Sequence, residues 1–146
     1  MRGWLCATLL AWGCSRGPAG PVTITPGQEA CASCRMLVSD LRTAAQLVAP
    51  GEEPLVFDDL GCLQSYLQTH HPPTGAQAYV ADHRTRAWVP ASHAVITRVR
   101  ALRTPMDSHL VAHADEASRA ADDEARGGER LTAQAFLNGQ TAEVSR

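Results

Sequence analysis

Five cysteines in a chain of 146 residues constrain the fold most, because an odd number of cysteines does not form a closed disulfide framework. They are Cys6, Cys14, Cys31, Cys34 and Cys62. The fold must therefore rest on an apolar core, and the length fits one domain. Hydrophobic residues make up 45% of the chain and aromatic residues only 5%, so we expect a core of Leu, Val and Ala.

The first two cysteines lie in a segment typical of protein export. Arg2 precedes an uncharged run over 4–12, which is too short to span a bilayer but suits a signal peptide. The residues before Cys14 resemble the lipobox of bacterial lipoproteins, in which cleavage leaves a lipid-carrying cysteine at the new N-terminus. We therefore predict a lipoprotein signal peptide over 1–13 and lipidation of Cys14. An ordinary signal peptide or a short buried helix is the alternative.

The composition changes after Cys14. Residues 14–28 are rich in Pro and Gly and are predicted to form a flexible tether, followed by one folded domain over 29–140 and a polar tail over 141–146. A lipid anchor places this domain on the extracytoplasmic, periplasmic side of a bacterial membrane. Ser15 does not resemble the signal for inner-membrane retention, so the outer membrane is favoured.

The domain is predicted to be α+β with small mixed or antiparallel sheets. Leu60, Leu63 and Leu67 repeat at helical spacing behind Asp59, so we expect a helix over 59–69. A second helix is expected from Asp115 to the Gly-Gly pair that follows residue 126. Short apolar runs predict strands at 36–38, 44–48, 55–57, 76–81, 88–89, 94–99, 108–114 and 131–137. The order strand–strand–helix–strand therefore occurs twice, over roughly 31–81 and 87–137.

The charged residues exclude several functions. All 13 basic residues are Arg, and with 15 acidic residues the net charge is −2, so we expect no nucleic-acid partner. The absence of Lys excludes a Schiff-base lysine and a Walker-type phosphate site. Asp58 and Asp59 are interpreted as helix-capping residues, and no nucleophile elbow is present. We therefore predict that the protein is not an enzyme and has no catalytic residues.

The remaining chemistry concentrates in the segment Cys31-Ala-Ser-Cys34-Arg-Met36. Thiolates and thioethers are soft donors, and together they favour Cu(I) over harder ions. A second group of donors, Met106 and His109, follows Pro105, with His113 four residues further on. The candidate metal ligands are therefore Cys31, Cys34, Met36, Met106 and His109. The methionines have the alternative role of filling gaps in the core.

Three alternatives use the same cysteines. Cys31 and Cys34 suit a structural disulfide in an exported protein, or the redox pair of a thiol–disulfide oxidoreductase. Against the second, such motifs open a helix, whereas 36–38 predicts a strand. A structural zinc site would add Cys62 and a His. Cys62 lies near a helix start and is explained more readily as a small buried residue than as a ligand, and His83 is expected to be superficial or structural.

Seven motifs in this order resemble the NosL family, which comprises copper-binding lipoproteins implicated in supplying copper to nitrous oxide reductase. They are Cys31-Ala-Ser-Cys34-Arg-Met36-Leu, Phe57-Asp-Asp-Leu-Gly-Cys62-Leu, Ala78-Tyr-Val-Ala-Asp82, Ala87-Trp-Val-Pro-Ala91, Thr104-Pro-Met106, Ala112-His-Ala-Asp115 and Gly127-Gly-Glu129. The resemblance implies a lipid-anchored Cu(I) chaperone built from two strand–strand–helix–strand units. Its copper would be held first by Cys34 and Met36 and then by Met106 or His109.

The resemblance also implies a partner, an apo-enzyme that receives the copper, such as nitrous oxide reductase. Two positions depart from the family pattern. Arg35 stands where the family often has Gly or Met, and Asp107 stands where it often has Gly. These departures allow a recipient other than nitrous oxide reductase.

Overall fold

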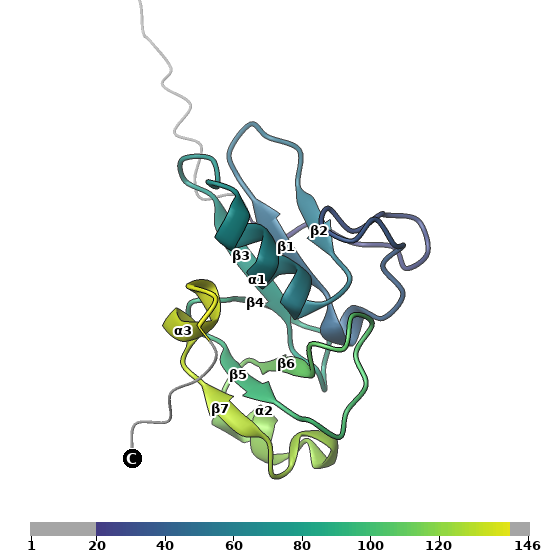
Figure 1. Cartoon of the computed structure of the whole chain (residues 1–146), viewed down its shortest axis with the longest axis vertical. Coiled ribbons are helices and arrows are strands. Elements are labelled where there is room, and N and C mark those ends of the chain that lie inside the picture. Colours follow the sequence, from purple (N-terminus) through teal and green to yellow (C-terminus); the bar gives the residue numbers. More distant parts are fainter. Residues whose placement is uncertain (1–19, 141–146) are drawn as a thin grey trace, which may run out of the picture.

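Two small antiparallel sheets form the framework of the protein, and the computed structural model describes residues 20–140 (Figure 1). The first sheet has the strand order β2-β1-β3-β4, and the second has the order β6-β5-β7. The strands are β1 Ala45–Val48, β2 Leu55–Phe57, β3 Gln77–Ala81, β4 Trp88–Pro90, β5 Val95–Arg98, β6 Leu110–His113 and β7 Glu129–Leu131. The helices are α1 Leu60–Thr69, α2 Glu116–Ala120 and α3 Ala133–Leu137, with 3-10 turns η1 Leu41–Thr43 and η2 Asp123–Ala125.

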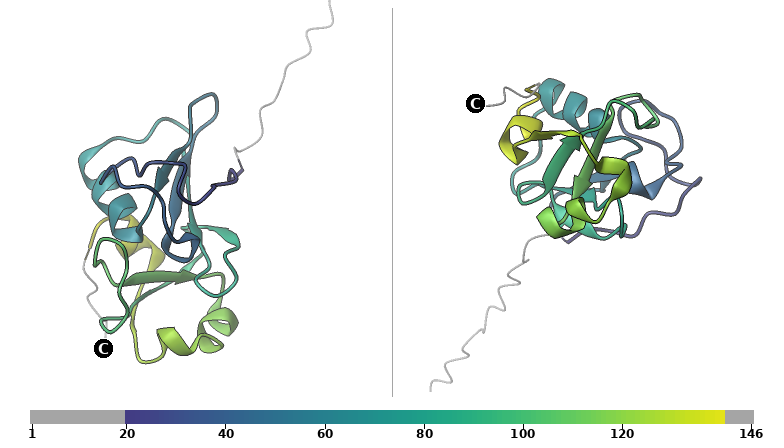
Figure 2. Two further views of the ribbon diagram at one scale, coloured as in Figure 1. Left: turned by 90° about the vertical axis from the view of Figure 1, so that its right-hand side faces the viewer. Right: turned by 90° about the horizontal axis from the view of Figure 1, so that it is seen from below.

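The predicted repeat is present in both halves of the described chain. The first unit is β1-β2-α1-β3 and the second is β5-β6-α2-β7, so the predicted α+β class is confirmed. Helix α1 packs on β1 and β2, whereas α2 and η2 lie at the end of the molecule opposite the β1–β2 hairpin (Figures 1 and 2). The predicted signal peptide and Cys14 lie outside the described residues.

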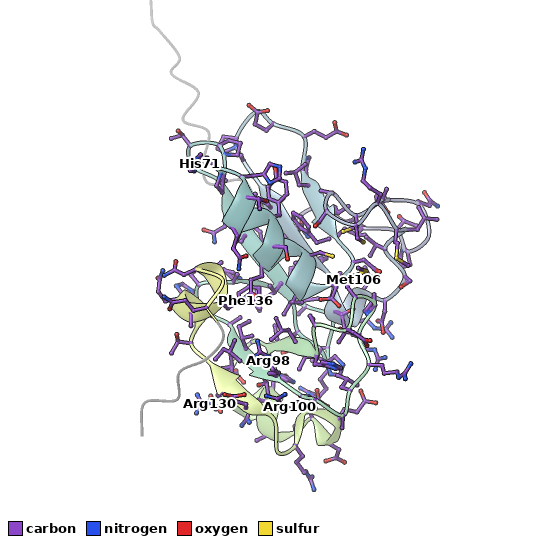
Figure 3. The ribbon with its side chains drawn as sticks, in the orientation of Figure 1. His71, Arg98, Arg100, Met106, Arg130 and Phe136 are labelled. Atoms are coloured by element: carbon purple, nitrogen blue, oxygen red, sulfur yellow. The ribbon has the colours of Figure 1, made fainter. Side chains whose placement is uncertain are left out.

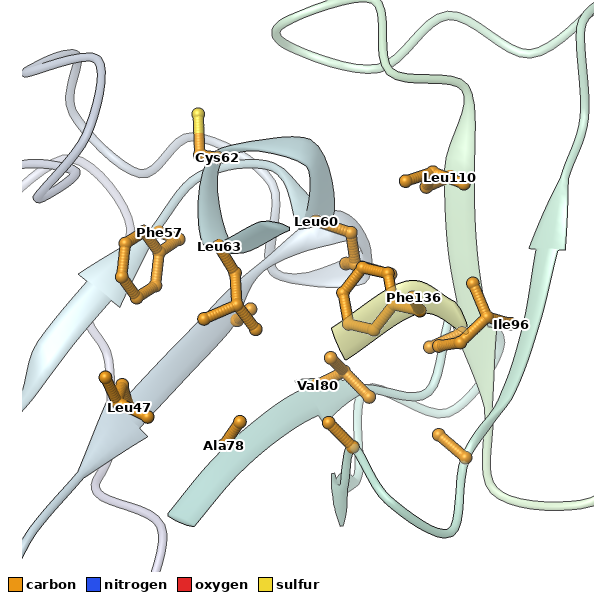
Figure 4. Close-up of a cluster of buried hydrophobic side chains, with 14 of the residues drawn as sticks. Leu47, Phe57, Leu60, Cys62, Leu63, Ala78, Val80, Ile96, Leu110 and Phe136 are labelled. Atoms are coloured by element: carbon orange, nitrogen blue, oxygen red, sulfur yellow. The ribbon is translucent and has the colours of Figure 1, made fainter. Parts of the chain in front are cut away.

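One apolar core joins the two sheets (Figure 4). Both units contribute to it, because β1, β2 and β3 of the first unit and β5, β6 and β7 of the second each bury apolar side chains there. Its larger members are Leu47, Phe57, Leu60, Leu63, Val80, Ile96, Leu110 and Phe136. Leu60 and Leu63 belong to the spacing that predicted the helix, and both are fully buried. Apart from the two Phe residues, these members are aliphatic, as the low aromatic content leads one to expect.

Asp82 ties the two units together. It follows β3 and forms a parallel bridge with Ala112 of β6. Its buried carboxylate accepts hydrogen bonds from Ala114 N at 2.8 Å and from Ser118 Oγ at 2.7 Å. Burial acts to raise the pKa of this carboxyl, but the hydrogen bonds from Ala114, Ser118 and Thr85 outweigh it and hold the pKa far below its usual range. The charged form of Asp82 therefore stabilises the junction between the sheets.

The described domain begins earlier than the sequence predicted. Val22 N donates to Gln46 Oε1 at 2.7 Å, and Gln46 Nε2 donates back to the Val22 carbonyl at 3.1 Å. Ile24 is buried in a small apolar cluster with Val38. Val22 and Ile24, which belong to the tether predicted over 14–28, thus contact the folded domain. None of the helices within residues 20–140 is long and apolar enough to cross a membrane.

Two predicted elements near the C-terminus are corrected. The strand expected over 131–137 ends at Leu131, and α3 follows because Thr132 Oγ1 caps it by accepting from Ala135 N at 3.0 Å. This helix carries Phe136 into the core. The helix expected from Asp115 stops at Ala120 instead of continuing to the glycine pair. A new cap, the Asp122 carboxylate, then starts η2.

The strand expected over 36–38 is also wrong. Only Leu37 makes a β-bridge there, and its partner is Ala30, which lies earlier in the chain. The reason is a local turn that brings the chain back on itself before β1 begins.

Candidate metal centre

This turn, over 30–37, carries the first two cysteines. Its first and last residues form an antiparallel bridge, and Cys31 N donates to the Met36 carbonyl at 2.7 Å. Ala32 N donates to the Val56 carbonyl at 2.8 Å, which fastens the turn to β2. The turn therefore presents its cysteines from a fixed backbone.

Arg35 and Asp107 have backbone conformations that are uncommon for residues other than glycine. Arg35 has φ of 68° and Asp107 has φ of 53°, so both lie in the left-handed region that favours glycine. Glycine would adopt this backbone without strain. In this chain Arg35 and Asp107, which both carry a Cβ, adopt this backbone conformation instead.

The third cysteine comes from the start of α1. Asp59 caps this helix, because its Oδ1 accepts from Gly61 N at 2.7 Å, and Cys62 follows in the first turn. Asp59 Oδ2 also accepts from Met106 N at 2.9 Å, so the cap fixes the loop that carries Met106. A Cβ on Gly61 would lie 2.6 Å from Ser108 Cβ, so only glycine permits this close approach of loop and helix.

The three cysteines converge. The sulfur atoms of Cys31, Cys34 and Cys62 all lie within 4.8 Å of one another, and none of the three is in a disulfide. Cys31 and Cys62 are buried, and Cys34 is partly exposed. The sulfur of Cys62 points away from Phe57 and Leu63, at the edge of the core (Figure 4). Cys62 was expected to be a small core residue, but its neighbours make it a candidate ligand.

The backbone around Cys31 favours its thiolate. Burial acts to raise the pKa of this thiol, but hydrogen bonds from the backbone N–H groups of Cys34, Asp58 and Ser33 outweigh it and leave the pKa below its ordinary value. Burial raises the pKa of Cys62, and the negative charge of Cys31 raises it further. Burial also raises the pKa of Cys34. Of the three thiols, Cys31 therefore loses its proton most readily, and a cation bound there would favour loss of the other two protons.

An open pocket of about 370 Å³ lies over the cluster. Met106 lines it from the loop beside the N-terminal end of α1, where Figure 3 labels it, and its side chain is 45% exposed. The residues that line the pocket are Ser33, Cys34, Gly61, Cys62, Gln64, Ser65, Arg98, Met106, Ser108 and Leu110. The pocket therefore combines two thiols with one thioether from a distant segment.

Two other predicted ligands lie elsewhere. Met36 is 53% exposed and does not line the pocket. His109 Nδ1 bonds the Leu102 carbonyl at 2.7 Å, and His109 does not line the pocket either. Among the described residues, the structure thus joins Cys31, Cys34 and Met106 of the predicted set, and it adds Cys62.

The residues matched by the NosL family model run from 21 to 143. The chain belongs to the NosL family. NosL proteins are an accessory family associated with copper and are not a known enzyme family. The three-cysteine group of this NosL domain is able to bind a metal ion, and thiolates suit a soft ion such as copper. A comparison with curated proteins gave no match.

Proposed function

We propose that the protein carries one Cu(I) ion on Cys31, Cys34 and Cys62. The observation that carries this proposal is the convergence of three thiols below an open pocket. Thiolates favour Cu(I), and the ion has no need of the four-coordinate shell that structural zinc requires. The cluster therefore suits a cargo that is bound by few donors.

The exposed methionines support transfer of this cargo. Met106 lines the same pocket as Cys34 and Cys62, so its thioether supplies an additional soft donor at the opening. Met36 is exposed on the turn that carries the first two cysteines. A recipient reaching the pocket would add its own ligand before the thiols release the ion. Ligand exchange of this kind moves copper without freeing it into solution.

Two further proposals concern the recipient of the copper and the location of the protein. We propose that the recipient is an extracytoplasmic copper enzyme, such as apo nitrous oxide reductase. A lipid on Cys14 would hold the domain at a bacterial membrane, on its periplasmic side. This anchor would restrict delivery to recipients at or near that membrane.

Zinc is the second candidate for the cluster, because three thiols also suit Zn²⁺. A closed zinc site needs a fourth ligand, and within residues 20–140 no His, Asp or Glu joins the three thiols. The neighbour that the pocket supplies is Met106, a poor zinc donor. The donor set therefore favours copper.

A thiol–disulfide oxidoreductase is supported less well. Its redox pair opens a helix, whereas Cys31 and Cys34 lie in a turn that closes on a β-bridge. The third thiol beside the pair also favours metal binding over disulfide exchange.

The experiment is an anaerobic competition for Cu(I) between the protein and a chromophoric chelator. We expect one Cu(I) per chain. The affinity should fall at least about tenfold in each of Cys31→Ser, Cys34→Ser and Cys62→Ser, since each change removes a thiolate that binds the ion directly. His71→Gln, on an exposed residue outside the cluster, is the control and should bind as the parent does. Unchanged affinity in all three serine variants would contradict the proposal.

The same titration compares the two methionines. Met106→Leu should weaken Cu(I) binding or speed its loss to the chelator, because Met106 lines the pocket. Met36→Leu tests the ligand role that the sequence predicts for Met36. Metal analysis of the protein purified without oxygen separates copper from zinc. Zinc retained against excess Cu(I) would favour the structural alternative.

A further inference from the structure

A second group of metal-ligating side chains lies where the two sheets meet. His83 follows β3, His113 ends β6, and Asp122 lies between α2 and η2. All three are buried, with exposed fractions of 2%, 0% and 7%. Their donor atoms lie within 4.8 Å of one another. No short sequence spacing relates these residues, so the fold alone brings them together.

One carboxylate oxygen contacts both rings. Asp122 Oδ2 lies 2.6 Å from His83 Nδ1 and 2.9 Å from His113 Nε2. The other oxygen of Asp122 accepts from Glu124 N at 3.0 Å, and this bond fixes the carboxylate at the start of η2. His83 is held in turn by its own backbone, because its N–H donates to the Ala112 carbonyl at 2.8 Å. Two imidazole nitrogens thus meet at one carboxylate oxygen, and the three residues come from three segments of the chain.

We propose that His83, His113 and Asp122 form a second metal site, for a divalent ion of borderline softness such as Zn²⁺ or Cu²⁺. Two imidazoles and a carboxylate are an established donor set for Zn²⁺, with the remaining position left for another ligand. A tetrahedral ion with bonds of about 2.0–2.1 Å needs donors about 3.3 Å apart. The present contacts of 2.6 and 2.9 Å are hydrogen-bond lengths. On binding, the donors would therefore separate by about 0.7 Å at His83 and about 0.4 Å at His113.

The surroundings of His83 fit this role. A metal on its Nδ1 places the ring proton on Nε2, and that atom lies 3.6 Å from Glu124 Oε2. A carboxylate beside the second ring nitrogen is the usual support for a metal-bound histidine. Glu124 is also half-exposed and pairs with Arg42 at 3.2 Å, so η2 extends from the buried cluster to the protein surface. Movement of this short turn would admit the ion.

This site would differ from the thiol cluster in the ion that it selects. Nitrogen and oxygen donors suit divalent ions, whereas the three thiols suit Cu(I). Among the described residues, His113 Nδ1 is buried without a hydrogen-bond partner, so the contact with Asp122 is the hydrogen bond that orients this ring. The competing explanation is a hydrogen-bonded clamp that joins the sheets and binds no metal.

The deciding experiment records imidazole ¹⁵N signals of the full chain by NMR during addition of Zn²⁺ beyond the capacity of the thiols. We expect the signals of His83 Nδ1 and His113 Nε2 to move to metal-bound positions before those of the exposed His71 and His93 change. This readout follows the two rings directly and holds whether or not the thiols bind copper. Unmoved His83 and His113 signals at saturating Zn²⁺ would overturn the proposal and support the clamp.

Variants supply a second readout. His113→Gln should remove one Zn²⁺ per chain, or weaken it at least about tenfold, without altering the reactivity of the thiols. His93→Gln is the matched control on an exposed histidine. Equal Zn²⁺ stoichiometry and affinity in the two variants would also overturn the proposal. If His113→Gln fails to fold, the NMR titration of the parent chain decides.

Discussion

Asp59 makes two bonds that can be separated experimentally. Its Oδ1 caps α1 through Gly61 N at 2.7 Å, and its Oδ2 holds Met106 N at 2.9 Å. Loss of an N-cap costs about 1 kcal/mol, and a hydrogen bond to a charged group contributes about 1.5–3 kcal/mol. We therefore expect Asp59→Ala to lower the free energy of unfolding by about 3 kcal/mol. This is a large share of the total for a domain of this size, which is about 5–15 kcal/mol.

Urea unfolding followed by circular dichroism measures this change. With a slope of about 1.5 kcal/mol per molar urea, the midpoint should fall by about 2 M. Asp115→Ala is the matched control, because Asp115 caps α2 through Ser118 N at 2.8 Å but is exposed and makes no second side-chain bond of this kind to any residue within 20–140. Its midpoint should fall by about 0.7 M. Equal shifts in the two variants would refute the argument that Asp59 fixes the Met106 loop.

Three further predictions concern backbone and charge. Alanine normally stabilises a helix by about 1 kcal/mol relative to glycine. Gly61→Ala should instead lower the free energy of unfolding by about 1–3 kcal/mol, measured in urea, because the added Cβ would contact Ser108. The same contact should displace the Met106 loop. A more stable Gly61→Ala would show that the contact is not tight. Arg35→Gly should leave the melting temperature unchanged or slightly higher, since φ is 68° there, and a large decrease would contradict this. The pKa of Asp82 is lowered in the fold, so its contribution is complete above about pH 4 and is lost as the pH falls further. Asp82→Asn should have a lower free energy of unfolding than the parent at pH 7 and should lose less of it on acidification. Parallel curves of unfolding free energy against pH for the two proteins would exclude this role of the Asp82 carboxylate.

Much of the fold could be predicted because local signals agree with it. Asp59 and the spacing of Leu60 and Leu63 define the start and the buried face of α1. Short apolar runs define most of the strands. The predicted strand over 131–137 failed because Thr132 starts a helix there, and this helix buries the apolar side chain of Phe136. Apolar content alone does not separate a short strand from a short helix.

The site could be predicted only in part. The pair Cys31 and Cys34 is visible as a motif because both residues lie in one turn. Cys62 is 28 residues beyond Cys34 and joins them only because α1 begins beside that turn. The same limit applies to Met36, which the motif suggests as a ligand although its side chain lies outside the pocket. Local spacing in the sequence indicates which kinds of donor atom are present. The packing of distant segments determines which of those residues come together at the site.

The most direct measurement is the sulfur coordination of bound Cu(I) by X-ray absorption, on the parent chain and on Cys62→Ser. We expect three thiolate neighbours in the parent, from the three converging cysteines, and one fewer in Cys62→Ser. An identical sulfur shell in both proteins, or a shell made mainly of nitrogen and oxygen, would contradict a copper site built on Cys31, Cys34 and Cys62.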